Sequence, residues 1–306
     1  MRIAVFGCGA MGSIYAGLLA SNGHEVMCID RNQRHVNAIN AKGLRVSGAS
    51  GDRTVAVQAF THPPDQLVDL LVIAVKATHV SAASDARQMV YATSTVLTIQ
   101  NGLGSADIVA EIFKPEQLIV GVAQGFGASR PELGHSHHND MKAIRMGNYG
   151  SPNRSQLKSV IDAFSQAGFN AESVDDIAVI QWEKLICNAA YSGPCALTGM
   201  TIGEVLDDPV MGPLSRAAAI ETWEIAKKRG IAITVEDPVA YVREFALRMR
   251  NAKPSVLLDI EAGRLSEIGV INGAVEREAL IIGIKAPVNA RITSLVRSLE
   301  ERNFQN

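Results

Sequence analysis

Short apolar segments alternate with amphipathic ones over the first half of the chain. The apolar segments that predict strands are residues 2–6, 25–29, 68–75, 95–99 and 118–122. Residues 68–75 form an almost continuous apolar run, which is typical of a strand buried on both faces. Residues 10–22 and 32–41 predict helices, which Gly23 and Gly43 end. This alternation predicts a parallel sheet covered by helices.

The pattern changes after about Gly168. A last strand is predicted at residues 169–174, and helical periodicity then continues nearly to the end. The predicted helices are residues 176–191, 213–229, 238–251, 255–283 and 289–302. A chain of 306 residues is longer than one hydrophobic core usually organises. We therefore expect an α/β Rossmann-type parallel-sheet domain over residues 1–174, followed by an all-α domain over residues 175–306.

Composition narrows the classes of partner. The formal net charge of −2 gives no whole-chain electrostatic reason to expect nucleic acid or an anionic membrane as a partner. No uncharged apolar run has the length of a membrane span, and the first residues predict a strand rather than a secretion signal. The cysteines Cys8, Cys28, Cys187 and Cys195 form no C-x-x-C pair and are typical of small buried residues in a reducing compartment. We expect a cytoplasmic protein.

A glycine-rich loop follows the first predicted strand and opens the first predicted helix. It comprises Gly7, Cys8, Gly9, Ala10, Met11 and Gly12. The first glycine allows a tight turn, the second lets the backbone approach a pyrophosphate, and the third lets the helix pack closely on the strand. The N–H groups and partial positive charge at the helix N-terminus favour phosphates. The loop therefore predicts a dinucleotide-binding βαβ unit.

Polar residues at the ends of the predicted strands are candidate cofactor ligands. Asp30 is typical of a residue that hydrogen-bonds the ribose 2′-hydroxyl of NAD(H), whereas the adjacent Arg31 can accommodate the 2′-phosphate of NADP(H). These signals conflict, and two solvated loop charges are the alternative to both. Lys76 and Asn101 follow two later strands, at the edge where ligands bind in such folds. An asparagine there can also orient a substrate group.

Polar residues share faces of two predicted helices in the second half. Lys184 and Asn188 are four residues apart, and Ser192 follows one turn later. Within residues 255–283, the residues at spacings of four and eight are Ser255, Asp259 and Glu267. A charged face in contact with solvent is the alternative explanation of both sets.

Residues 134–140 are rich in histidine and invite comparison with a metal site. No acidic or cysteine partner at ligand spacing accompanies His135, His137 and His138. The composition is typical of a loop or turn. We expect a loop here and no bound metal.

Together these motifs make the chain resemble the ketopantoate (2-dehydropantoate) reductase family over essentially its whole length. The shared motifs are the glycine-rich loop, Val75-Lys76-Ala77, Gln100-Asn101-Gly102, Trp182-Glu183-Lys184-Leu185 with Asn188, Asp259-Ile260, Glu267-Ile268 and Ile271-Asn272-Gly273. The resemblance implies a Rossmann domain and an all-α domain, with the substrate in the cleft between them. It also implies NADPH-dependent reduction of a 2-oxo acid, a small-molecule substrate, to a 2-hydroxy acid.

The resemblance further implies roles for individual residues. Hydride delivery to a ketone carbon creates an alkoxide, which needs a proton and electrostatic support. Lys184 would be the general acid, and Glu267 would hold its ammonium or bind a substrate hydroxyl. The candidate substrate contacts are Asn101, Asn188, Ser192, Ser255 and Asp259.

Several positions on the substrate side depart from the family pattern. The usual Asn-Pro-Leu-Thr segment is replaced by Ser192-Gly193-Pro194-Cys195, and Ile202 stands where an asparagine usually precedes a Gly-Glu pair. Changed polar groups in a pocket can change the substrate, because a site that hydrogen-bonds a hydroxyl discriminates strongly. Three functions therefore stay open: a ketopantoate reductase, a related reductase for another branched or bulky 2-oxo acid, and a dinucleotide-sensing protein without turnover. A homodimer also stays open, because an apolar stripe along a helix is compatible both with a dimer interface and with an internal core.

Overall fold

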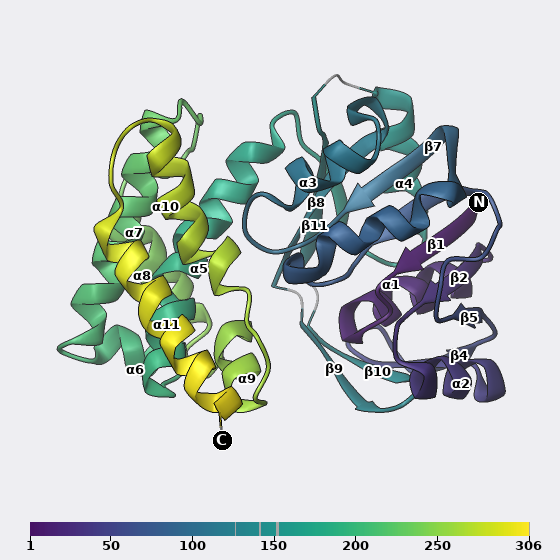
Figure 1. Cartoon of the computed structure of the whole chain (residues 1–306), viewed down its shortest axis with the longest axis horizontal. Coiled ribbons are helices and arrows are strands. Elements are labelled where there is room, and N and C mark those ends of the chain that lie inside the picture. Colours follow the sequence, from purple (N-terminus) through teal and green to yellow (C-terminus); the bar gives the residue numbers. More distant parts are fainter. Residues whose placement is uncertain (126, 141, 151–152, 306) are drawn as a thin grey trace. The chain divides into compact units, whose positions relative to one another are not determined.

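An eight-stranded sheet organises the first part of the chain (Figure 1). The structure, a computed structural model, describes residues 1–125, 127–140, 142–150 and 153–305. It divides into two units, Met1–Gln100 with Ser105–Ile177, and Asn101–Gly104 with Ala178–Asn306. The sheet belongs to the first unit, which we call the α/β unit, and the second is the helical unit.

The large sheet has the strand order of dinucleotide-binding proteins. Its strands are β1 (Arg2–Phe6), β2 (Glu25–Ile29), β5 (Gln58–Phe60), β6 (Val68–Ile73), β7 (Val90–Thr98), β8 (Leu118–Gln124), β11 (Ala143–Asn148) and β12 (Ala171–Ser173). They are ordered β12-β11-β8-β7-β6-β1-β2-β5, and every adjacent pair is parallel except β11 with β8. The run from β5 to β8 is the doubly wound order. The predicted Rossmann-type sheet is confirmed.

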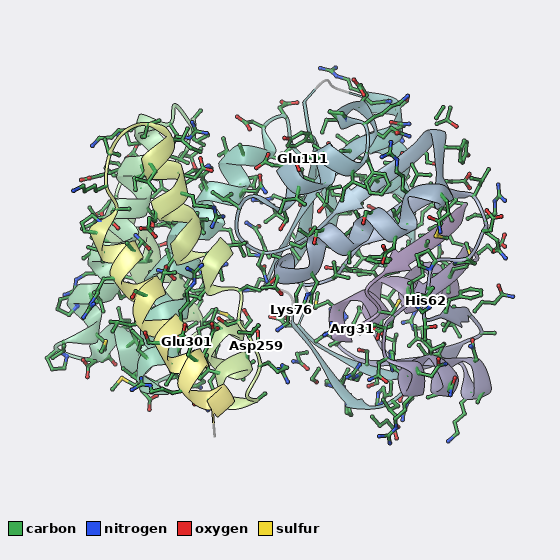
Figure 2. The ribbon with its side chains drawn as sticks, in the orientation of Figure 1. Arg31, His62, Lys76, Glu111, Asp259 and Glu301 are labelled. Atoms are coloured by element: carbon green, nitrogen blue, oxygen red, sulfur yellow. The ribbon has the colours of Figure 1, made fainter. Side chains whose placement is uncertain are left out.

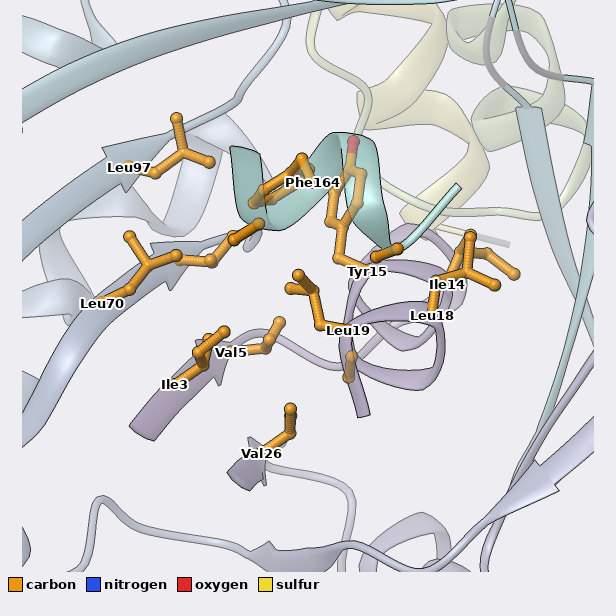
Figure 3. Close-up of a cluster of buried hydrophobic side chains, with 14 of the residues drawn as sticks. Ile3, Val5, Ile14, Tyr15, Leu18, Leu19, Val26, Leu70, Leu97 and Phe164 are labelled. Carbon is orange, nitrogen blue, oxygen red and sulfur yellow. The ribbon is translucent and has the colours of Figure 1, made fainter. Parts of the chain in front are cut away.

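Helices cover both faces of this sheet. They are α1 (Ala10–Ser21), α2 (Gln33–Lys42), η1 (Ala77–Met89), α3 (Ser105–Ile112), η2 (Pro115–Gln117) and α4 (Arg154–Gln166). Alternate β1 residues point to opposite faces, so that Ile3 and Val5 pack with α1 and α4 while Ala4 packs with η1 and α3. Figure 3 shows Tyr15 of α1 and Phe164 of α4 in the first of these cores.

A second sheet of four strands packs against α1. Its strands are β3 (Leu44–Gly48), β4 (Arg53–Val55), β9 (Gly127–Glu132) and β10 (His135–Asp140), in the order β4-β3-β10-β9. The helix carries Gly17 where this sheet approaches, and a Cβ at that position would lie 2.3 Å from Cγ2 of Val46 on β3. The loop predicted at residues 134–140 is therefore wrong. His135 of β10 has a hydrogen-bond partner within the sheet, Oγ of Ser47 at 2.8 Å, so this polar side chain can be buried in a strand.

The helical unit is built around one long buried helix. Its helices are α5 (Ile177–Thr198), α6 (Ile202–Asp207), α7 (Met211–Lys228), α8 (Pro238–Arg248), α9 (Ser255–Glu261), η3 (Ile268–Val270), α10 (Asn272–Ile281) and α11 (Pro287–Gln305). In α5, Leu185 and Ala189 pack into one core while Ile186 and Ala190 pack into another. In the described part of the chain, no helix combines the length and apolarity that crossing a bilayer requires.

Two predicted helix boundaries in this unit are wrong. α5 does not end at residue 191 but continues through Pro194 to Thr198. The helix packs closely on α11 at this point, because a Cβ at Gly193 would lie 2.1 Å from Cγ2 of Ile292. This packing outweighs the cost of placing Pro194 inside the helix. The single helix predicted over residues 255–283 is instead three, α9, η3 and α10. Gly263, with φ +62°, follows the end of α9.

A buried polar network fixes the start of α11. The side-chain nitrogen of Asn289 donates to Oε2 of Glu221 at 2.8 Å and to the carbonyl of Ala218 at 3.2 Å. The amide oxygen of Asn289 accepts a hydrogen bond from Nδ2 of Asn272 at 2.8 Å. Both asparagines are fully buried, so their amide groups must find their hydrogen-bond partners inside the protein.

We expect Asn289→Ala to lower the free energy of unfolding by about 2–3 kcal/mol, because it removes a buried side chain together with its hydrogen bonds to Asn272, Glu221 and the carbonyl of Ala218. Urea unfolding followed by circular dichroism measures the change. Asn303→Ala is the control, since Asn303 is exposed on the same helix. Equal unfolding midpoints for the two variants would contradict the importance of this network.

Candidate functional site

The glycine-rich loop lies between β1 and α1, as predicted. Gly7 has φ +100°, and a Cβ there would lie 2.5 Å from the backbone nitrogen of Val75. A Cβ at Gly12 would lie 2.1 Å from the carbonyl oxygen of Gly7. At Gly9, by contrast, a Cβ would meet no atom of the described residues within 4 Å. The fold itself requires the first and third glycines, while the space beside Gly9 is open to a ligand.

Asp30 and Arg31, the two charged residues after β2, lie at the same edge of the large sheet as the glycine-rich loop. The backbone N–H groups of Gly7 and Cys8 both donate to the carbonyl of Ile29, the last residue of β2. Oδ1 of the next residue, Asp30, accepts a hydrogen bond from the backbone N–H of Asn32 at 2.9 Å. Arg31 is exposed, and Figure 2 shows it in the α/β unit. Both residues are therefore positioned near the loop, and the conflict between the NAD and NADP signals persists.

Lys76 is held at the same edge by the end of β6. The side-chain nitrogen of Gln100 donates to the carbonyls of Ile73 at 2.7 Å and Val75 at 3.1 Å, which ties the ends of β6 and β7 together. Lys76 follows directly as the N-cap residue of η1 and is partly buried. Because Val75 packs against Gly7, the backbone of Lys76 lies close to the glycine-rich loop.

Asn101 belongs to the helical unit although it follows a strand of the α/β unit. The segment Asn101–Gly104 packs on the residues around η3, where the backbone N–H of Leu103 donates to the carbonyl of Val270 at 3.0 Å. Nη2 of Arg277 donates to the carbonyl of Leu103 at 3.3 Å. Gly102 has φ +76°, and a Cβ there would lie 2.0 Å from the carbonyl oxygen of Val270. Only glycine therefore allows this close approach.

This packing brings Asn101 to Lys184. Nζ of Lys184, on α5, donates to Oδ1 of Asn101 at 2.7 Å. Burial of the ammonium group lowers the pKa of Lys184 to about 8, and the negative charge of Glu267 partly opposes that shift. Glu267 is itself buried and lies at the N-terminal end of η3. The structure thus gathers Asn101, Lys184 and Glu267 from three separate segments of the chain.

The remaining predicted residues have different surroundings. Asn188 lies one turn after Lys184 on α5 and is partly buried, and Ser192 is buried a further turn along. Ser255 is exposed at the first turn of α9. Asp259 is buried and accepts a hydrogen bond from Arg264 at 3.1 Å.

The common helical face predicted for Ser255, Asp259 and Glu267 is wrong. Glu267 lies beyond the end of α9, and the chain turns between them at Gly263. The backbone N–H of Arg264 donates to the carbonyl of Asp259 at 2.8 Å, and the two side chains form an ion pair. These contacts turn the chain before Glu267, whereas the spacing of polar residues suggested an unbroken helix.

Sequence reasoning missed the residues that hold the site together. Arg277 supports the Asn101 segment across 174 positions, and Lys184 meets Asn101 across 83. No spacing rule connects residues so far apart. Within the Gln-Asn-Gly motif, the glycine indicates a turn with positive φ at Gly102. It gives no indication that Asn101 contacts Lys184.

An ammonium with a pKa near 8 next to a buried carboxylate and an amide oxygen is suited to proton transfer. It remains mostly protonated at neutral pH and can lose its proton at modest cost. The glycine-rich loop has the features of a pyrophosphate site, because its backbone is open at Gly9 and α1 begins there. The chain therefore carries a lysine whose pKa suits acid–base chemistry and a loop of the dinucleotide-binding type.

Comparisons with known proteins match both parts of the chain to one family. Sequence models of the family described as ketopantoate reductase PanE/ApbA match residues 3–151, and those of its C-terminal part match residues 176–300. A 2-dehydropantoate 2-reductase of Pyrococcus abyssi (strain GE5 / Orsay) is 30% identical over 98% of this chain and 98% of its own length.

Solved structures share the fold of the whole chain. A PanE/ApbA family ketopantoate reductase from Ralstonia eutropha JMP134 is 29% identical, with a TM-score of 0.91 and 99% of both chains covered. The ternary structure of D-mandelate dehydrogenase with NADH and anilino(oxo)acetate has a TM-score of 0.91, at 25% identity and with 99% of both chains covered. On the matches to both of its parts, the chain belongs to the ketopantoate reductase PanE/ApbA family.

Proposed function

We propose that this chain reduces a 2-oxo acid to a 2-hydroxy acid with a reduced nicotinamide dinucleotide, and that its substrate is 2-dehydropantoate (ketopantoate). The observation that carries the proposal is the environment of the partly buried Lys184. Its ammonium donates a hydrogen bond to Asn101, and the negative charge of Glu267 raises its pKa. The 2-dehydropantoate 2-reductases among its relatives support the choice of substrate.

The α/β unit has the residues that a dinucleotide needs. The backbone of the loop Gly7-Cys8-Gly9-Ala10-Met11-Gly12 would hold the pyrophosphate, and the absence of a Cβ at Gly9 leaves room for it. Asp30 and Arg31 would contact the adenosine ribose, while Lys76 and Asn101 would contact the rest of the cofactor. When bound, the reduced nicotinamide supplies a hydride.

Lys184 supplies the proton that completes the reduction. Its Nζ donates to the oxygen of the substrate's ketone, and its positive charge stabilises the alkoxide that forms there. Glu267 keeps the ammonium protonated at neutral pH, since its carboxylate raises the pKa of Lys184. Asn101 orients the ammonium through the 2.7 Å hydrogen bond. Asn188, Ser192, Ser255 and Asp259 are the further substrate contacts that we propose.

NADP(H) is the cofactor that we favour, because the exposed guanidinium of Arg31 is free to lie along a 2′-phosphate. One oxygen of Asp30 already accepts a hydrogen bond from the backbone of Asn32, which leaves less of its carboxylate for a ribose hydroxyl. NAD(H) is the alternative, since the second oxygen of Asp30 can still accept from that hydroxyl.

A second candidate function is reduction of a bulkier 2-oxo acid with NADH. Ile202, which replaces a polar family residue, is buried among apolar side chains, so this position offers no hydrogen bond. The D-mandelate dehydrogenase structures, one of them with NADH and anilino(oxo)acetate, provide a precedent for a large apolar substituent on this fold. The Asp30 carboxylate is compatible with that cofactor.

We expect Lys184→Met to lower kcat for 2-oxo acid reduction by about 10²–10⁴-fold, because the variant has no proton donor at the ketone oxygen. The dissociation constant for NADPH, measured by fluorescence titration, should stay within about twofold, because Lys184 is not among the residues that we place on the cofactor. Lys228→Met is the matched control, since Lys228 is exposed on α7. Undiminished turnover by Lys184→Met would rule out the proposed mechanism.

The pH dependence follows from the lowered pKa of Lys184. We expect kcat/KM for ketone reduction to fall as the pH rises above about 8, because deprotonated Lys184 cannot donate a proton. Oxidation of the 2-hydroxy acid should increase over the same range, because that direction needs the free amine.

The same measurement tests Glu267. Glu267→Gln should move the alkaline limb of reduction to lower pH, since the lost carboxylate is a group that raises the pKa of Lys184. Glu261→Gln, which removes an exposed carboxylate paired with Lys253, should leave that limb in place. Coincident pH profiles for wild type and Glu267→Gln would contradict the role given to Glu267.

A steady-state comparison separates the two candidate functions. With NADPH and NADH tested against ketopantoate and phenylglyoxylate, we expect the highest kcat/KM for NADPH with ketopantoate. Arg31→Ala should raise KM for NADPH by about tenfold and leave KM for NADH within about twofold, because only NADPH carries the 2′-phosphate. A preference for NADH with phenylglyoxylate would instead establish the second candidate.

A further inference from the structure

Buried side chains from three elements, two of them outside the βαβ unit, hold the carbonyls of the glycine-rich loop. The carbonyl of Cys8 accepts hydrogen bonds from Oγ of Ser13 at 2.9 Å and from Nε2 of His35 at 3.0 Å. The carbonyl of Ala10 accepts from Oγ of Ser136 at 2.7 Å. Ser13 belongs to α1, but His35 lies on α2 and Ser136 on β10 of the small sheet. All three donors are fully buried.

The contacts of His35 fix the state of its ring. The backbone N–H of Gly134, between β9 and β10, donates to Nδ1 of His35 at 3.0 Å, so Nδ1 carries no proton. Nε2 must then carry the proton that it donates to the carbonyl of Cys8. Only this neutral tautomer satisfies both contacts. Burial lowers the pKa of His35, which keeps the ring neutral.

Because the peptide bond is planar, a hydrogen bond that fixes a carbonyl also fixes the N–H group of the next residue. A carbonyl and the N–H of the following residue lie in one plane and point in opposite directions. Hydrogen bonds to the carbonyl of Cys8 therefore turn the N–H of Gly9 away from His35. In the same way, the hydrogen bond from Ser136 to the carbonyl of Ala10 restrains the N–H of Met11.

We propose that His35 and Ser136 are positioning residues for the cofactor, which hold the carbonyls of the glycine-rich loop so that the N–H groups of Gly9 and Met11 face the pyrophosphate. The inference rests on the proposed function, because it needs a dinucleotide at the loop. It gives the small sheet a role in cofactor binding, since both links run through the β9–β10 hairpin. A shorter βαβ unit without this sheet would lack both restraints.

The test is the dissociation constant for NADPH alone, measured by fluorescence titration with the full chain. His35→Ala should raise it about tenfold, equivalent to about 1.4 kcal/mol, and Ser136→Ala about threefold. At saturating NADPH both variants should keep kcat within about twofold, because neither residue touches the reacting atoms. His35→Gln should restore most of the affinity, since its amide can donate to Cys8 and accept from Gly134.

His138→Gln is the matched control, because His138 is a fully buried histidine of β10 that contacts Ser50 at 3.1 Å. Wild-type affinity in folded His35→Ala and Ser136→Ala, even with lower thermal stability, would overturn the positioning role. Should His35→Ala fail to fold, the affinity of Ser136→Ala decides. If the wild-type chain binds neither NADPH nor NADH, the proposed function itself fails, whereas normal wild-type binding with unaffected variants sinks only this inference.

Discussion

The hydrogen bond from Lys184 to Asn101 is the contact on which the arrangement of the helical unit's polar site depends. An ammonium removed from water is unstable unless the protein replaces its hydration, so Lys184 needs a nearby oxygen and a nearby negative charge. Asn101 provides the oxygen and Glu267 the charge. Asn101 can supply its oxygen because the chain leaves the sheet after Gln100 and joins the helical unit. Glu267 can supply its charge because α9 ends at Glu261 and the chain then turns.

The strength of each local signal decides how much of this the sequence could reveal. β1 and β2 occur where their short apolar runs predict them, because a strand buried on both faces admits few polar residues. The strand β10 was not predicted because the partner of its His135 and His137 is Ser47 of β3, which lies about ninety positions away. Composition alone cannot distinguish such a strand from a solvated loop.

The same limit applies to the candidate site. The spacing of Lys184, Asn188 and Ser192 on one helix was predictable, because a helical repeat fixes which residues share a face. The break in the helix before Glu267 was not, since it depends on contacts between Asp259 and Arg264 as well as on Gly263. Nor was the lowered pKa of Lys184, because it arises from burial by residues distant in sequence.

The three glycines of the loop are needed for different reasons. Gly7 and Gly12 are required by contacts inside the protein, whereas Gly9 faces space that no described residue fills. A side chain at position 9 would therefore obstruct a ligand without disturbing the core. Such a variant would escape the chaperones and proteases that remove misfolded chains, since they respond to lost stability rather than lost activity. A single substitution at position 9 of this chain could thus produce a long-lived, inactive protein, with abundance and fold both unchanged.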